Sequence, residues 1–180
     1  MLIQNLIACS ILILTFISAL SDISTAKLRN EIFVAGVVLG LTMNAALNGW
    51  HGVGFSLLGL LIPILVFLPL SSNHFNLFGF HGIKIIGMGD LKLFGYVGAL
   101  VCFPNVFTII FLTYIIGGVF SLFLMIRKKM LISRITYFFS WLIGYIKGGG
   151  KKEYVSAEQI KFAPFVFFAA CAYYLYQWVF

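Results

Sequence analysis

The chain is poor in charged residues, and acids are the scarcest of them. Charged residues make up 9% of the 180 positions, and the five acids include only two aspartates, Asp22 and Asp90. An ionisable carboxylate near lipid is costly to place and usually serves a function. The two aspartates are therefore the first candidates for chemistry.

Cysteine and histidine are scarce too, and their spacing excludes the common metal frameworks. The three cysteines stand singly within apolar runs, without a CxxC pair, so they predict neither a zinc site nor a disulfide framework. The three histidines have no ligand-like spacing, and no HExxH or GxSxG stretch occurs. The sequence gives no support to a zinc peptidase or a serine hydrolase, and we expect no metal site and no cofactor.

Apolar residues dominate the rest of the chain. They make up 62% of it and stand in long unbroken runs, whereas a membrane barrel would alternate apolar and polar residues. The runs predict an all-α integral membrane protein, a single domain over 1–180 with six transmembrane helices. The expected spans are 2–21, 32–48, 54–71, 90–104, 106–126 and 162–179.

Two apolar segments, the first run and residues 130–147, allow a second interpretation. The first run has no basic residue before it and no clear cleavage site before Asp22, which favours a span over a signal peptide. Residues 130–147 carry a polar or small stripe at helical spacing, which favours an amphipathic helix on the cytoplasmic face over a seventh span. The stripe consists of Ser133, Thr136, Ser140, Gly144 and Lys147.

All 12 basic residues fall on one side of this bundle if the N-terminus lies outside the cell. They occupy the loops 22–31, 72–89 and 127–161, apart from Lys92, which lies just inside a helix. The positive-inside rule places these loops in the cytoplasm, in a multi-pass protein of the cell inner (plasma) membrane. The net charge of +7 is explained by topology and by contact with anionic membrane lipid, and no nucleic-acid partner is expected.

Asp22 stands where the first apolar run ends. If the helix persists that far, one face of it carries a polar stripe, which suggests a face turned to the bundle interior or to a wet cavity. The stripe consists of Thr15, Ser18, Asp22 and Thr25. The alternative is an exposed loop acid that pairs with Lys27 or Arg29, and the residues alone leave both possibilities open.

Asp90 ends the tetrad Gly87-Met88-Gly89-Asp90. Gly87 and Gly89 lack a Cβ, so the backbone can bend sharply there and another segment can approach closely. The following run to Pro104 extends only about 22 Å as a helix, which is shorter than a hydrocarbon core of about 30 Å. Asp90 is therefore expected below the membrane surface unless the bilayer thins there. The alternative is an aspartate that merely caps the start of a span.

Two carboxylates within hydrogen-bond range of one water can hydrolyse a peptide bond. One activates the water and the other protonates the carbonyl oxygen or the leaving amine, because two like charges do not both ionise easily. The pair then shares a proton and titrates as a coupled unit. Asp22 and Asp90 at one membrane border therefore predict an aspartic peptidase.

Three segments resemble type IV prepilin peptidases, the GxGD membrane aspartic peptidases. They are Asp22 to Asn30, Gly87 to Lys92 and Lys161 to Phe165, and the layout is similar over nearly the whole chain. The resemblance implies that Asp22 and Asp90 are catalytic, that Gly87 and Gly89 shape a loop, and that Asn30 and Lys92 support it. It also implies cleavage of the basic leader from pilin-like precursors at the cytoplasmic border.

Two departures from the family pattern stand out. Arg29 replaces a proline that the family often has, and the paired CxxC motifs of the larger, N-methylating members are missing. The chain therefore resembles the short form, which is a peptidase only. Two other classes stay open: a small proton-coupled transporter, in which membrane acids relay ions, and a non-enzymatic component of a pilus or secretion machine.

Overall fold

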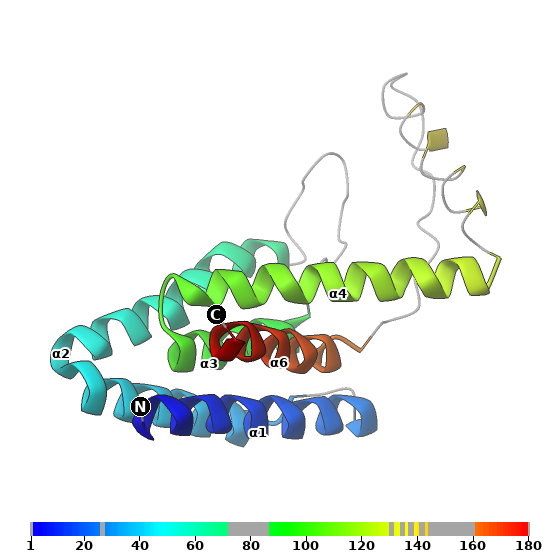
Figure 1. Ribbon diagram of the computed structural model, residues 1–180. Helices are drawn as coiled ribbons and strands as arrows, with labels where there is room; N and C mark the ends of the chain where they lie inside the picture. The colour runs from blue at the N-terminus through cyan, green and yellow to red at the C-terminus, as the bar shows by residue number, and fades with distance from the viewer. Residues whose placement is uncertain are drawn as a thin grey trace.

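The protein is described by a computed structural model that covers residues 2–25, 28–71, 87–129 and 161–179, with residues 132, 133, 136, 139, 140 and 143 between them. The ordered elements in these ranges are helices, packed as one bundle (Figure 1). They are α1 (Leu2–Thr25), α2 (Asn30–Ser71), α3 (Met88–Val101), α4 (Asn105–Arg127) and α6 (Ala163–Val179). Helices are the expected form, because a backbone in lipid must satisfy its own hydrogen bonds.

Three of these helices are long and apolar enough to cross a membrane, over Asn5–Thr25, Asn30–Pro69 and Asn105–Arg127. α6 is a shorter apolar helix, and α3 has 14 residues. The described elements are therefore helical and include three helices that could span a membrane, which fits the predicted all-α membrane protein. The count of six spans stays a prediction, and most of the amphipathic helix expected over 130–147 falls outside the described residues.

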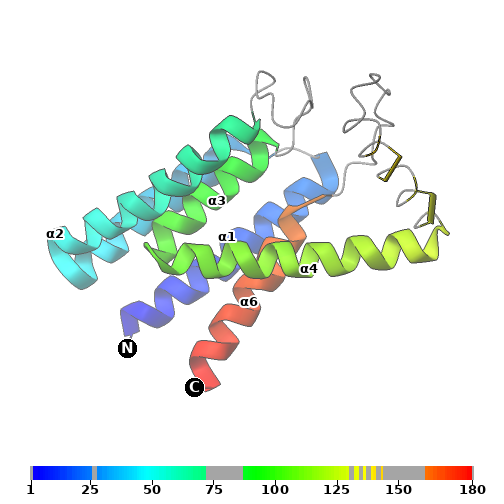
Figure 2. The same cartoon turned by 90° about the horizontal axis from the view of Figure 1, so that it is seen from above.

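α2 is one helical element of 42 residues that folds back on itself at Gly49. The sequence predicted two spans joined by a short turn, but only Gly49, with φ 58° and ψ −139°, leaves helical geometry. Glycine tolerates this backbone conformation and residues with a side chain avoid it. Figure 1 shows the two arms of α2 diverging from the fold-back, with α3 between them, and Figure 2 shows α3 along α2 from above.

α3 is the central helix, buried along its length from Leu93 to Val101. A Cβ on Gly59 would lie 2.2 Å from the carbonyl oxygen of Gly98, and one on Gly98 would lie 1.9 Å from that of Gly59. Two glycines thus allow the backbones of α2 and α3 to touch, as small residues do between membrane helices. This enclosure explains how a helix too short to span lipid can lie inside the protein.

Both arms of α2 cap the C-terminal end of α3. The last carbonyl groups of a helix have no partner within it. Asn44, from the first arm, donates its amide N–H to the carbonyl oxygens of Ala99 and Leu100, each at 3.1 Å. Ser56, from the second arm, donates its hydroxyl to the oxygen of Ala99 at 2.5 Å. α3 is therefore fixed along its axis as well as sideways.

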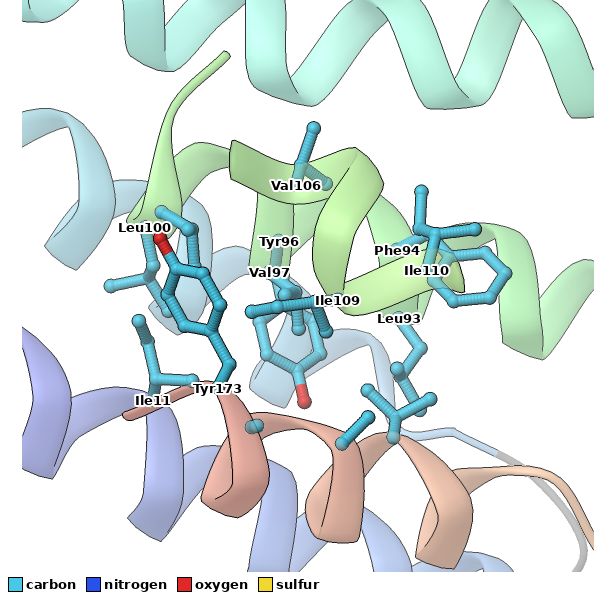
Figure 3. Packing of buried hydrophobic residues seen from close by; sticks show 14 of the residues in the cluster. Ile11, Leu93, Phe94, Tyr96, Val97, Leu100, Val106, Ile109, Ile110 and Tyr173 are labelled. Atoms are coloured by element: carbon cyan, nitrogen blue, oxygen red, sulfur yellow. The ribbon is translucent and has the colours of Figure 1, made fainter. Parts of the chain in front are cut away.

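The remaining helices close the bundle around α3 through one apolar cluster (Figure 3). It draws residues from α1, α3, α4 and α6, and lipid offers little hydrophobic drive for such contacts, so close packing has to hold them. Its labelled members are Ile11, Leu93, Phe94, Tyr96, Val97, Leu100, Val106, Ile109, Ile110 and Tyr173. The chain termini lie together at one end of the bundle, and the ends that carry the aspartates lie at the other.

Candidate active site

Asp22 lies in the last turn of α1, because the helix continues to Thr25 and does not stop at the predicted residue 21. Thr15 and Ser18, on the same face, are fully buried, and the hydroxyl of Ser18 lies 2.9 Å from that of Tyr96 on α3. The polar stripe therefore faces the bundle interior at these two positions, as expected. It leads to a partly buried Asp22.

The carboxylate of Asp22 meets the start of α6. Its Oδ2 accepts a hydrogen bond from the backbone N–H of Ala163 at 3.2 Å. The N-terminal end of a helix carries partial positive charge and favours a carboxylate there. Arg29, one of the two alternative partners expected for Asp22, instead pairs with Glu31 at 2.7 Å, and Lys27 lies outside the described residues.

Asp90 occupies the first turn of α3, at the same end of the bundle. Its Oδ2 accepts a hydrogen bond from the backbone N–H of Gly87 at 3.3 Å. This contact is half of a capping box, in which an acid three residues into a helix reaches back to the capping residue. Asp90 thus helps to cap the start of α3, as the alternative interpretation held, and this role is compatible with chemistry at the same carboxyl.

The environment of Asp90 favours its protonated form. Asp90 precedes the apolar part of α3 and lies outside the three helices that are long enough to span. Burial raises the pKa of its carboxyl from the ordinary 3.8 to about 6; the Gly87 hydrogen bond lowers this pKa, and the charge of Asp22 raises it. The two aspartates, 68 positions apart in sequence, therefore lie close enough to interact electrostatically.

Aromatic rings form a wall one helical turn from Asp90. Phe94 is four residues after Asp90, and positions four apart share a helix face. Its ring lies 5.7 Å from that of Phe67 on α2 and 5.7 Å from that of Phe162 just before α6. These rings lower the polarity on one side of the site, which agrees with burial as the main cause of the raised pKa of Asp90.

The two glycines of the tetrad do not form the sharp bend that the sequence suggested. Gly87 has φ −71° and ψ 147°, which any residue can adopt, and Gly89 lies within α3. A Cβ on Gly87 would lie 3.2 Å from the Oδ2 of Asp90, whereas one on Gly89 would make only ordinary contact, at 3.9 Å from Leu28. Gly87 thus leaves room beside the carboxyl, and the structure gives no steric reason for Gly89.

Asn30 and Lys92 contact each other, although 62 positions separate them. The ammonium group of Lys92 donates to the Oδ1 of Asn30 at 2.7 Å. This bond joins the start of α2 to the first turn of α3, two residues after Asp90. The pair lies where a supporting contact is expected, and its influence on chemistry stays a prediction.

The contact between Asp22 and α6 was not anticipated from the sequence as part of the site. The one available signal was the segment from Lys161 to Phe165, which was noted only as a motif that opens the last helix. The hydrogen bond joins residues 141 positions apart, so only the fold reveals it.

No group of three or more metal-ligating side chains occurs among the residues that the structure describes. A cavity of about 1020 Å³ lies at the other end of the bundle, near Asn5, Asn105 and Gln177. It contains neither aspartate, so it is separate from the site described above.

Comparison with known families gives one match. The model of the type IV leader peptidase family matches residues 9–122, which is more than half of the chain and includes both aspartates. No curated protein and no solved structure matches.

Proposed function

The chain belongs to the type IV leader peptidase family, and from this premise we propose that it is an aspartic endopeptidase whose catalytic pair is Asp22 and Asp90. The observation that carries the proposal is that the two carboxyls lie at the same end of the bundle, where the charge of Asp22 raises the pKa of Asp90. Family membership implies a peptidase, and the chain has no other aspartate. The substrates are pilin-like precursors, and the scissile bond is that of their basic leader.

Peptide hydrolysis by a carboxyl pair needs one protonated and one ionised carboxyl. Asp90 holds the shared proton, because burial and the charge of Asp22 both disfavour its ionised form. The ionised partner takes a proton from water while the water oxygen attacks the carbonyl carbon, and the protonated carboxyl donates to the carbonyl oxygen. A proton then passes to the amide nitrogen as the carbon–nitrogen bond breaks.

Purified full-length protein in lipid nanodiscs, mixed with a leader-bearing pilin precursor, tests the catalytic pair. Asp22→Asn and Asp90→Asn should each lower the cleavage rate by about 10³-fold or more, and the double variant should fall little further, because the two act as a unit. Glu31→Gln is the matched control, since Glu31 is an exposed acid in the first turn of α2. Wild-type rates in either aspartate variant would show that the pair is not catalytic.

The cytoplasmic position of the site is a separate part of the proposal. Trp50, next to the fold-back of α2, and Lys129, at the end of α4, are both exposed and lie near opposite ends of the bundle. In a variant without native cysteines, a membrane-impermeant thiol reagent applied to intact cells should label Trp50→Cys and spare Lys129→Cys. The reverse pattern would put the aspartates outside.

The reaction is proposed to end at hydrolysis, without methylation of the new N-terminus. The support is the absence of CxxC pairs, which the larger methylating members carry. Mass spectrometry of the cleaved product, made with and without added S-adenosylmethionine, should give the unmodified mass in both cases. A methylated product would remove this part of the proposal and leave the peptidase intact.

A further inference from the structure

Two contacts tie the end of α1 to the start of α6 in opposite directions. The backbone N–H of Ala163 donates to the Asp22 carboxylate at 3.2 Å. The ammonium group of Lys161 donates to the carbonyl oxygen of Ile23, the residue next to Asp22. Each helix end thus receives from the other the kind of partner that it lacks, since a helix begins with unpaired N–H groups and ends with unpaired carbonyls.

At the start of α6, the N–H of Ala163 is available to an acceptor outside the helix. Pro164 has no N–H, and the N–H of Phe165 bonds to the oxygen of Phe162 at 3.0 Å. The N–H of Ala163 therefore needs an acceptor from another element, and Asp22 supplies it. Ala163 itself is buried, so water does not replace this acceptor easily.

Lys161 compensates an unfavourable position of Asp22. A carboxylate in the last turn of a helix faces the negative end of the helix dipole, whereas a cation there is favourable. Lys161 brings its ammonium group to this turn and binds its backbone. Helix ends fray readily, so a contact at Ile23 restricts the turn that carries Asp22.

We propose that Lys161 is a positioning residue, which holds the last turn of α1 so that Asp22 stays on the N-terminus of α6 and in register with Asp90. The proposal rests on the catalytic role proposed above for Asp22. It extends the site to α6, which lies outside the matched residues 9–122. Lys161 acts through the backbone of α1 and does not contact the reacting atoms.

The kinetic test uses Lys161→Met, which keeps the length of the side chain and removes its charge and its donors. A displacement of about 1 Å at a catalytic group can cost up to about 10²-fold in rate. We expect kcat to fall about 10- to 100-fold, KM to change less than about 2-fold, and Lys161→Arg to restore most of kcat. Lys129→Met, an exposed lysine at the end of α4, is the matched control and should keep the wild-type kcat.

A spectroscopic test follows Asp22 without measuring activity. Because the chain has two aspartates, carbon-13 labelling of their carboxyl groups gives two signals, which the Asp→Asn variants assign. In Lys161→Met the Asp22 signal should shift or broaden more than the Asp90 signal, and in Lys129→Met both should stay in place. Lys161→Gln, which retains a donor, serves as the second variant if Lys161→Met does not fold.

The outcomes separate this proposal from the proposed function. An unchanged kcat with an unchanged Asp22 signal would overturn the positioning role. So would a fall in kcat that comes with a fall in Tm, if Lys161→Arg restores neither. If the wild-type protein cleaves no precursor, the proposed function fails, but the Asp22 signals still decide whether Lys161 positions that carboxylate.

Discussion

The contact of Gly59 with Gly98 predicts how strongly one methyl group disturbs the protein. In Gly59→Ala the added Cβ would lie 2.2 Å from the carbonyl oxygen of Gly98 and 2.9 Å from its carbonyl carbon, where ordinary contact begins at 3.4 Å. Both atoms belong to the backbone, so no side chain can turn aside. α2 and α3 must separate by about 1 Å, and overpacking of this kind costs about 1–3 kcal/mol.

Separation of the helices also stretches the hydrogen bond from Ser56 to Ala99, one turn from Gly59. Interhelical hydrogen bonds in membranes contribute about 0.6 kcal/mol on average. Alanine recovers about 0.8–1 kcal/mol through its higher helix propensity. The net loss in the free energy of unfolding is therefore about 1–3 kcal/mol. The cleavage rate should fall as well, because α3 carries Asp90.

Gly54→Ala provides the control on the same helix, because a Cβ there meets nothing within 4 Å. It should gain about 0.5–1 kcal/mol from propensity alone. Thermal unfolding of both purified variants in one detergent measures the contrast. For a chain of this length 1 kcal/mol corresponds to about 2–4 °C in Tm, so Gly59→Ala should unfold about 3–15 °C below Gly54→Ala. Equal Tm values would show that α2 and α3 are not in backbone contact at Gly59.

Three further predictions concern pH, the cap of α3 and the fold-back of α2. Because the pKa of Asp90 is raised to about 6, its carboxyl keeps a proton between about pH 4 and 6 in the folded state and loses it in the unfolded chain. The stability that this carboxyl contributes is therefore present at low pH and disappears as pH rises through about 6. For the same reason kcat/KM should fall on the alkaline side with a midpoint near pH 6. In Asp22→Asn, carbon-13 titration should give Asp90 a lower midpoint that still exceeds 3.8, because burial is the main cause of the raised pKa. A midpoint at 3.8 would contradict this prediction. Asn44→Leu removes the donor to the last carbonyls of α3 and should cost about 1–2 kcal/mol in chemical or thermal unfolding, whereas an unchanged midpoint would mean that other groups satisfy these carbonyls. Gly49→Ala places a side chain at φ 58° and should cost about 1–3 kcal/mol, whereas Gly118→Ala, at an open helical position, should be neutral or slightly stabilising; equal Tm values would contradict the strained backbone at Gly49.

The sequence was sufficient for those features that depend on local pattern. Unbroken apolar runs predicted the helices, and the spacing of Thr15 and Ser18 predicted which face of α1 turns inward. The helix ends were less accurate: α1 continues past residue 21 to Thr25, and α3 ends at Val101, before the predicted residue 104.

Contacts between distant segments could not be predicted in the same way. Nothing near Asp22 in the chain specifies Ala163 as its donor, and nothing near Gly98 specifies Gly59 as its neighbour. The short run after Asp90 suggested that Asp90 lies below the membrane surface or that the bilayer thins. The structure offers another explanation, because α2 encloses α3 from both arms and supplies its cap.

The fold-back at Gly49 also determines at which end of the bundle the second aspartate stands. α2 leaves the end of the bundle where Asp22 lies and returns to it, so the chain between the two carboxyls runs to the other end of the bundle and back. A straight helix of 42 residues would extend about 63 Å, twice the hydrocarbon core of about 30 Å, and would deliver α3 to the far surface. One glycine with a positive φ therefore decides at which end of the bundle the second carboxyl arrives.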